Sequence, residues 1–125
     1  MQVCADVAER ERDTVMLGRT HGQAAVPITF GLKAAVWLDE LRRQLVRLDE
    51  ASPRISVVKF LGAGGTGAAQ GVNARELQRL IMTHLGVGVP LATTQVVGRD
   101  RYIEYVAWLA NVAASWEKIL QEIRN

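Results

Sequence analysis

The C-terminal part of the chain carries an almost unbroken apolar stripe at helical spacing. Ten residues follow one another in steps of one or three positions: Tyr102, Tyr105, Val106, Leu109, Val112, Ala113, Trp116, Ile119, Leu120 and Ile123. Steps of this size bring side chains to one side of an α-helix. No charged residue lies between Val106 and Trp116, and alanines there allow close approach of a neighbour. The pattern predicts a helix from about residue 95 to residue 124.

A helix of that length would be about 45 Å long, because each residue adds ~1.5 Å. A compact monomer of 125 residues is only ~35 Å across, so the helix would extend beyond its own domain. A helix that is apolar on nearly all sides is typical of the interior of a bundle. The sequence therefore predicts an all-α, long-helix bundle that other chains help to complete, and hence an oligomer.

The rest of the chain alternates helical patterns with glycine-rich connections. Helices are expected at residues 2–12, 29–50 and 73–85, and mostly turn and extended chain at residues 14–31. In the second helix, leucines at 38, 41, 45 and 48 form one stripe, and Pro53 is expected to end it. Residues 55–60 fit either a short strand or another turn.

Both ends of the chain interrupt helical patterns. The first residues, MQVCADVAERERD, start without a cap, and the last, LQEIRN, stop without glycine or proline. We therefore expect a fragment of a longer protein, in which residues 1–125 form part of a single central helical domain.

Composition argues against several classes of protein. Hydrophobic residues make up 49% and charged residues 22%, as in soluble globular domains. The net charge of +2 is spread along helix surfaces, which argues against nucleic-acid binding. No apolar run approaches the ~20 residues that span a bilayer, so no membrane association is expected. The single Cys4 cannot form an internal disulfide, and a cytoplasmic location is the expectation.

The stretch MLGRTHGQAAVP holds one of the two histidines in a segment too rich in glycine to be core. At neutral pH an imidazole can donate or accept a proton, so His21 is a candidate acid or base. A turn residue without chemistry is the alternative. His84 falls at a helix end, where a surface position suits it. Two distant histidines and one cysteine give no metal-ligand spacing, and we expect no metal and no cofactor.

Two other segments allow both a structural and a functional interpretation. The glycines at 62, 64, 65 and 67 lack the Gly-Lys-Ser/Thr of a phosphate-binding loop. They fit a flexible turn, or a loop whose backbone must come close to a ligand or another subunit. Gln95 and Arg99–Arg101 open the last helix. They form either a plain helix start, capped by one of the preceding threonines, or a polar ring facing an anionic substrate.

A family resemblance rests on the same stretches. Gly18-Arg19-Thr20-His21-x-Gln23, followed by Pro27 and Thr29-x-Gly31, resembles the second of three active-site stretches in the fumarase/aspartase superfamily. GAGGTGA is similar to the superfamily's Gly-Thr segment at the same relative place. TFGLK and the stretch from TTQVVGRDR onward resemble the branch that acts on purine nucleotides. The resemblance covers nearly the whole chain.

The resemblance implies a β-elimination that releases fumarate from a succinylated purine nucleotide, a small anionic substrate. By the family pattern His21 is the general acid that protonates the leaving nitrogen, and the neighbouring Thr20 contacts substrate. Gln95 matches a substrate-binding glutamine. The resemblance further implies a homotetramer in which three subunits build each active site, in agreement with the long apolar helix.

The chain also departs from the family pattern. The superfamily's base is a serine on a loop with the signature Ser-Ser-x-Met-Pro-x-Lys-x-Asn-Pro, which is absent from this sequence, and so is the first active-site stretch. The glycine at 98 replaces a polar residue often found before the last helix. We therefore expect about one third of an active site, and an isolated chain without activity.

Two alternatives stay open. A carboxymuconate cycloisomerase-like member of the same superfamily shares TFGLKAA and the Arg-Asp-Arg triplet. A helical oligomerisation module without chemistry would use the apolar last helix equally well.

Overall fold

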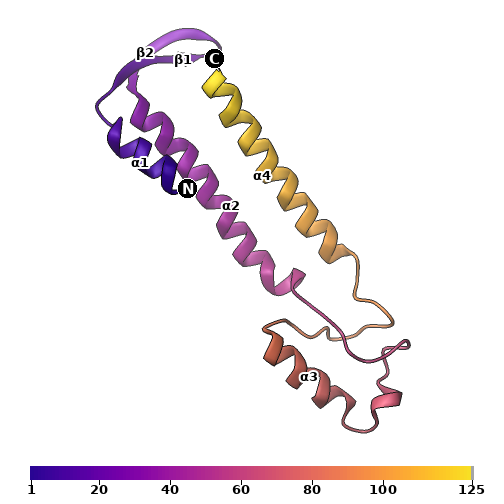
Figure 1. The fold of residues 1–125 in the computed structure, drawn as a ribbon. Coiled ribbons are helices and arrows are strands. Elements are labelled where there is room, and N and C mark those ends of the chain that lie inside the picture. The colour runs from indigo at the N-terminus through magenta and orange to yellow at the C-terminus, as the bar shows by residue number, and fades with distance from the viewer. Residues whose placement is uncertain (125) are drawn as a thin grey trace. The chain divides into compact units, whose positions relative to one another are not determined.

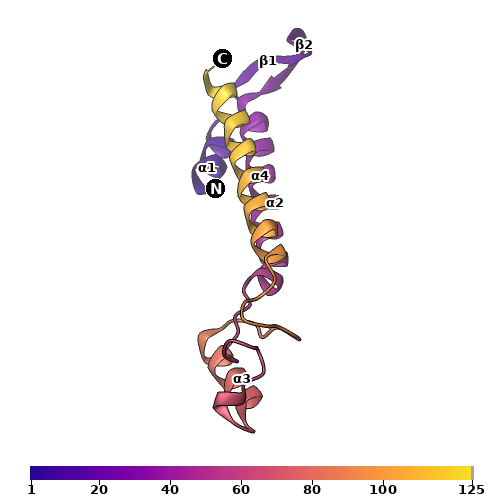
Figure 2. The same cartoon turned by 90° about the vertical axis from the view of Figure 1, so that its right-hand side faces the viewer.

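The computed structural model describes residues 1–124, which are mainly helical (Figures 1 and 2). The elements are α1 (Gln2–Arg10), β1 (Val15–Thr20), β2 (Gln23–Thr29), α2 (Phe30–Ile55), a 3-10 turn (Ala68–Gln70), α3 (Ala74–Leu85) and α4 (Asp100–Arg124). The prediction of a helical fold with short extended segments is confirmed. None of the helices in the described part is long and apolar enough to cross a membrane.

The chain forms two compact units, which we describe separately. The hairpin unit contains Met1–Val46 with Ala110–Asn125, and the glycine-loop unit contains Arg47–Leu109. The core of the hairpin unit comprises Ala34, Trp37, Leu41 and Ile119, with Cys4, Val7, Ala8 and Phe30 packed against it. Figure 1 shows α1 lying beside the first part of α2. Their backbones come close, since a Cβ on Gly31 would lie 2.5 Å from the Ala8 carbonyl oxygen.

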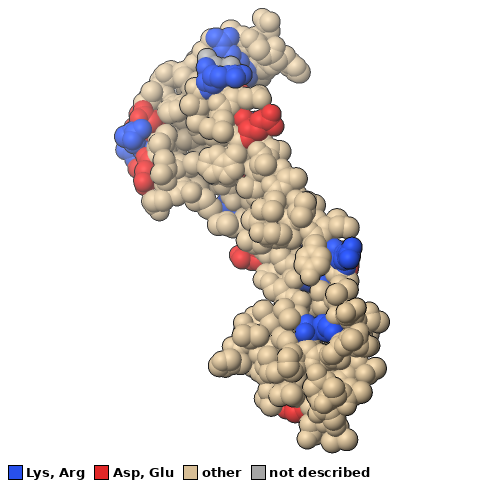
Figure 3. Space-filling view, turned by 45° about the vertical axis from the view of Figure 1, so that its right-hand side comes forward, with Lys and Arg blue, Asp and Glu red and all other residues tan. Residues whose placement is uncertain are grey.

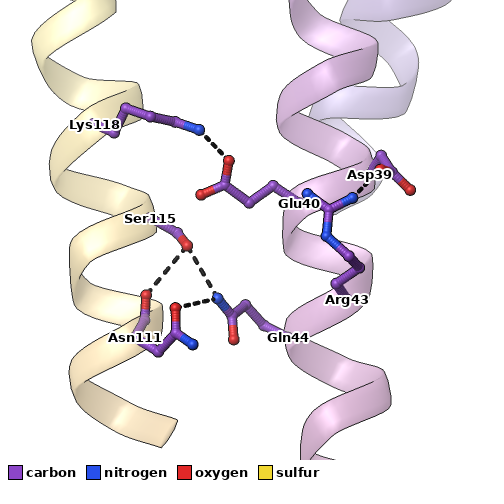
Figure 4. Close-up of polar contacts among 7 residues, drawn as sticks. All are labelled: Asp39, Glu40, Arg43, Gln44, Asn111, Ser115 and Lys118. Carbon is purple, nitrogen blue, oxygen red and sulfur yellow. Dashed lines mark hydrogen bonds and ion pairs between the residues drawn. The ribbon is translucent and has the colours of Figure 1, made fainter.

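The contact between α2 and α4 inside the hairpin unit is polar (Figure 4). The Gln44 amide donates to Asn111 Oδ1 at 3.0 Å and to Ser115 Oγ at 3.1 Å. Ser115 in turn donates to the backbone carbonyl of Asn111 at 3.1 Å. One helical turn further along, Lys118 pairs with Glu40. Gln44 and Ser115 are buried, so these hydrogen bonds fix how the two antiparallel helices align.

The buried face of α2 differs from the leucine stripe expected from the sequence. Leu41 is buried, but Leu45 is 49% exposed, and the polar Gln44 is buried in its place. The reason is that the neighbouring helix offers hydrogen-bonding partners to Gln44. An apolar pattern identifies a helix, but the partner decides which residues become buried.

The same arrangement turns most of the apolar stripe of α4 away from α2. Ile119 is the one stripe residue that is buried, whereas Trp116 is 43%, Leu120 59% and Ile123 64% exposed. Tyr102, Tyr105, Val106 and Leu109 are exposed as well. The face drawn in Figure 3 carries few charged side chains, separated by wide uncharged areas. Large apolar side chains that stay exposed along one helix are typical of a surface that packs against another molecule.

Two predicted helix boundaries are wrong. α4 begins at Asp100 and not near residue 95, because the preceding segment forms a loop in which Thr93 Oγ1 donates to the Val96 carbonyl at 2.9 Å. α2 continues through Pro53 to Ile55. The proline lies in the last helical turn, where only one backbone hydrogen bond is lost. Arg54 strengthens this end of the helix by bonding to the Glu50 carbonyl at 2.7 Å and to Glu104 at 2.5 Å.

The ion pairs between α2 and α4 make stability depend on pH. The hydrogen bond from Lys118 lowers the pKa of Glu40, and that from Lys33 lowers the pKa of Glu122. A carboxyl with a lowered pKa in the folded state stabilises the fold above its unfolded pKa, and this stabilisation is lost as pH falls through the folded pKa.

We predict that Glu40→Gln lowers the free energy of unfolding at pH 7 by less than ~1 kcal/mol, because the pair is partly exposed to solvent. It should also reduce the loss of stability on acidification, since the titrating carboxyl is gone. Thermal unfolding followed by circular dichroism at neutral and acidic pH measures both effects. Glu117→Gln is the control, because Glu117 has no ion pair within residues 1–124. Equal acid sensitivity of Glu40→Gln and the unmodified chain would contradict the prediction.

Candidate functional site

The segment with His21 forms an antiparallel hairpin. β1 and β2 pair Val15 with Thr29, and the last pair before the turn is Thr20 with Gln23. Two residues remain for the loop, His21 and Gly22, with φ angles of 51° and 74°. Positive φ at both central residues defines a type I′ turn, whose twist matches that of the flanking strands. The predicted extended and turn structure is confirmed at this segment, and its exact form is a tight hairpin.

His21 is the one non-glycine residue with positive φ in the described part of the chain. The first position of a type I′ turn strongly favours asparagine, aspartate or glycine, whereas most side chains are strained in the left-handed region. Histidine is tolerated there better than most residues, but less well than asparagine. A strained residue at an exposed tip is a reason to look for a function of its side chain.

The three sequence-predicted site residues fall into two groups. Thr20 and His21 are neighbours at the exposed tip of the hairpin. Gln95 is exposed in the loop that precedes α4, within the glycine-loop unit. The structure therefore brings Thr20 and His21 together, and Gln95 is not part of the helix that it was expected to open.

A hollow of about 790 Å³ lies beside the hairpin, lined by β1, β2, the start of α2 and the end of α4. Two cationic residues line it, Arg19 and Lys33. Lys33 pairs with Glu122 at 2.5 Å and stands 5.9 Å from the centre of the Trp37 ring. Lys33 was not predicted as a site residue, because nothing in the sequence indicates that its side chain lines the same hollow as the hairpin.

The glycine-rich loop packs against the chain itself. A Cβ on Gly65, which has a φ of 73°, would collide with the Thr93 carbonyl oxygen and lie 2.8 Å from that of Thr94. Close approach of the backbone was one of the two interpretations from the sequence. In this structure the backbone that Gly65 approaches is the segment just before Gln95. The loop thereby supports the segment that carries a predicted substrate-binding residue.

Two further expectations concern histidine and metal. His84 lies exposed in the last turn of α3, as expected for a helix C-terminus. Within residues 1–124 no group of three or more His, Cys, Asp or Glu side chains is placed to hold a metal ion.

Comparison with known proteins identifies the family. The sequence profile of the family described as "Lyase" matches residues 1–125. The adenylosuccinate lyase of Methanothermobacter thermautotrophicus is 45% identical over 125 residues, which is 100% of this chain and 28% of that protein. The adenylosuccinate lyase of Pyrococcus abyssi is 44% identical over 123 residues, or 98% and 27% of the two chains.

Solved structures lead to the same superfamily. A fumarate lyase from Mesorhizobium sp. BNC1 matches with a TM-score of 0.86 and 45% identity, covering 98% of this chain and 29% of that one. The 3-carboxy-cis,cis-muconate lactonizing enzyme from Pseudomonas putida matches with a TM-score of 0.83 and 34% identity, covering 97% and 27%. The chain therefore belongs to the lyase family of the fumarase/aspartase superfamily. It spans about 28% of the length of the curated relatives it matches.

We predict that Gly65→Ala destabilises the glycine-loop unit strongly, by about 2–4 kcal/mol, because positive φ and a collision with backbone act together. Gly62→Ala is the matched control, since it has a φ of 69° but open space around the new Cβ. It should cost only ~1 kcal/mol. Urea unfolding of both variants measures the difference. Equal destabilisation of the two would show that the close approach to Thr93 contributes nothing.

Proposed function

We propose that the whole protein containing this chain is an adenylosuccinate lyase, which splits adenylosuccinate into AMP and fumarate and also cleaves the succinyl-carboxamide intermediate of purine synthesis. The observation that carries the proposal is the placement of His21 at an exposed, strained turn within a chain 42–46% identical to four adenylosuccinate lyases. A role in AMP biosynthesis in the cytoplasm follows from that reaction, and the free Cys4 suits a reducing compartment.

In this proposal the reaction is a β-elimination with two proton transfers. A base removes the proton from the carbon next to a carboxylate, and the electron pair forms the C=C bond of fumarate as the C–N bond breaks. His21, as imidazolium, donates its proton to the leaving nitrogen, which becomes the amino group of AMP. The base lies outside this chain, because the serine loop of the superfamily is absent from its sequence.

The remaining predicted residues bind the anionic substrate. Thr20, next to His21 at the tip, can donate a hydrogen bond to a carboxylate or phosphate. Gln95 offers an amide at the exposed loop that Gly65 supports. Arg19, one residue before Thr20, adds positive charge on the same strand. Cationic and amide groups of this kind stabilise charge that develops during elimination.

We also propose that the protein is a homotetramer with active sites shared between subunits. The apolar stripe of α4 supports this proposal, because most of it faces away from α2 and stays exposed. Packing against helices of other subunits would bury the stripe in the manner of a helical bundle. It would also bring segments from different subunits together at one site. Such sharing is needed because this chain carries only part of the catalytic residues.

A carboxymuconate cycloisomerase-like activity is the second candidate. It is favoured by the similarity to the Pseudomonas putida lactonizing enzyme, at 34% identity and a TM-score of 0.83. Turnover of adenylosuccinate against carboxymuconate by the whole protein distinguishes the two activities. A module without chemistry would turn over neither.

We predict that His21→Asn lowers kcat for adenylosuccinate cleavage in the whole protein by ~10²-fold or more. Asparagine fits the type I′ turn better than histidine, so the hairpin stays intact and the loss reports the imidazole itself. His21→Ala should lose as much activity and also weaken the turn. Absorbance at the wavelength of the purine chromophore follows the reaction, and the 125-residue chain alone should be inactive. Full activity of His21→Asn would overturn the assignment of the general acid.

We predict that Leu120→Glu splits the tetramer into smaller species, because a charge in a buried helix contact lacks a partner. Light scattering coupled to size-exclusion chromatography measures the mass. Val72→Glu is the control, since Val72 is fully exposed in the glycine-loop unit and lies outside the apolar stripe. A Leu120→Glu protein of unchanged mass would exclude this part of α4 from the subunit contact.

A further inference from the structure

The hairpin that carries His21 contains an irregularity just before its tip. Leu17 pairs with Pro27, but the next pair recorded along the ladder is Arg19 with Ala24. Gly18 alone therefore faces two residues of β2, Ala25 and Val26. This arrangement is a β-bulge, which bends a strand, increases its twist and changes the direction of the side chains that follow.

The bulge determines the register in which the hairpin closes. On the Leu17 side, the regular pairing continued without interruption would put Thr20 opposite Ala24 and leave three residues in the loop. The extra residue on β2 shifts the register by one, so that Thr20 pairs with Gln23 and two residues remain. Only this shorter loop forms the type I′ turn that holds His21 at a φ of 51°.

Gly18 has no room for a side chain. It is buried, and a Cβ there would lie 2.5 Å from the Val26 carbonyl oxygen and 3.1 Å from Ile28 Cγ2. The carbonyl belongs to the bulge itself, so β2 would have to move. Proline lacks an N–H and is tolerated beside a bulge, which explains why the ladder is interrupted next to Pro27. It does not explain why the strand facing the bulge carries glycine.

We propose that Gly18 and the bulge opposite it position the imidazole of His21, which makes Gly18 a positioning residue for the elimination. The inference rests on the proposed function of His21 as general acid. Proton donation requires the imidazole at hydrogen-bond distance from the leaving nitrogen, and a displacement of about 1 Å can cost ~10²-fold in rate. The bulge sets the orientation of the two strand pairs that follow it, Arg19 with Ala24 and Thr20 with Gln23. The turn that holds His21 directly joins the second of these pairs.

The test compares three variants of the whole protein. Deletion of Ala25 removes the extra residue and leaves a regular ladder with the same two-residue loop. Gly18→Ala keeps the extra residue but forces β2 to move. The double variant, Gly18→Ala with Ala25 deleted, relieves the collision with the Val26 carbonyl because the bulge is gone. Its remaining close contact, to Ile28 Cγ2, is with a side chain that can adjust. NMR contacts between Thr20 and Gln23 verify the turn, and thermal unfolding verifies the fold.

We expect kcat to fall ~10-fold or more in all three variants, because the imidazole is displaced from the leaving nitrogen. KM should rise as well, since Thr20 lies in the last strand pair and moves with the turn. The loss should be smaller for a substrate analogue whose leaving group needs no proton. A damaged fold would instead slow both substrates equally. Since the double variant should regain the thermal stability that Gly18→Ala loses, it separates folding from positioning.

Two outcomes overturn the proposal. The first is a kcat like that of the unmodified protein after deletion of Ala25, and the second is recovery of kcat together with stability in the double variant. His21→Asn is measured alongside. If it stays active, the assignment of the acid fails. If it is inactive while the deletion variant is fully active, only the positioning role of Gly18 fails.

Discussion

The alignment of α2 with α4 depends on the hydrogen bonds of one buried glutamine, Gln44. Gln44 donates from one helix to Asn111 and Ser115 of the other, in a contact where the side chains of Gln44 and Ser115 are 4% and 3% exposed. Each such bond adds only ~1 kcal/mol net, but a buried amide left without partners would cost more. The contact therefore selects one alignment of the helices more than it adds to total stability. Any rotation of α4 that brought its apolar stripe inward would break these bonds.

The rotation of α4 about its own axis decides which of its side chains are exposed. With Gln44 and Ser115 at the helix contact, Trp116, Leu120 and Ile123 remain exposed. The buried core of the hairpin unit is correspondingly small, with four residues at its centre. Small cores give marginal stability, and exposed apolar faces favour association. One face of α4 thus makes the polar contact with α2, and another face carries the apolar stripe. Because the polar face packs inside the chain, the apolar face stays exposed for the proposed contact between subunits.

Much of the helical fold could be predicted from the sequence because helical periodicity is local. The helices and their approximate limits follow from residues three and four apart, and the glycine-rich segment around His21 reads directly as turn and extended chain. Non-local features could not be read in this way. Leu45 belongs to the leucine stripe, yet Gln44 is buried in its place, because Asn111 and Ser115 of α4 offer it hydrogen bonds. The partner of Gly65 is almost thirty residues away, at Thr93. The ion pair near the end of α2 joins Arg54 to Glu104, fifty residues further along the chain.

The candidate site was partly predictable for a different reason. The motif around His21 carried the family resemblance, but the motif does not contain the geometry that makes the histidine unusual. That geometry comes from the closing register of the hairpin, which depends on one extra residue in β2. The hairpin is regular in its first three pairs, and both of its irregular features lie between the Leu17–Pro27 pair and the tip. If they served stability alone, asparagine in the turn and an uninterrupted ladder would serve better. Their concentration at the end that bears the imidazole is what a hairpin shaped for presenting His21 requires.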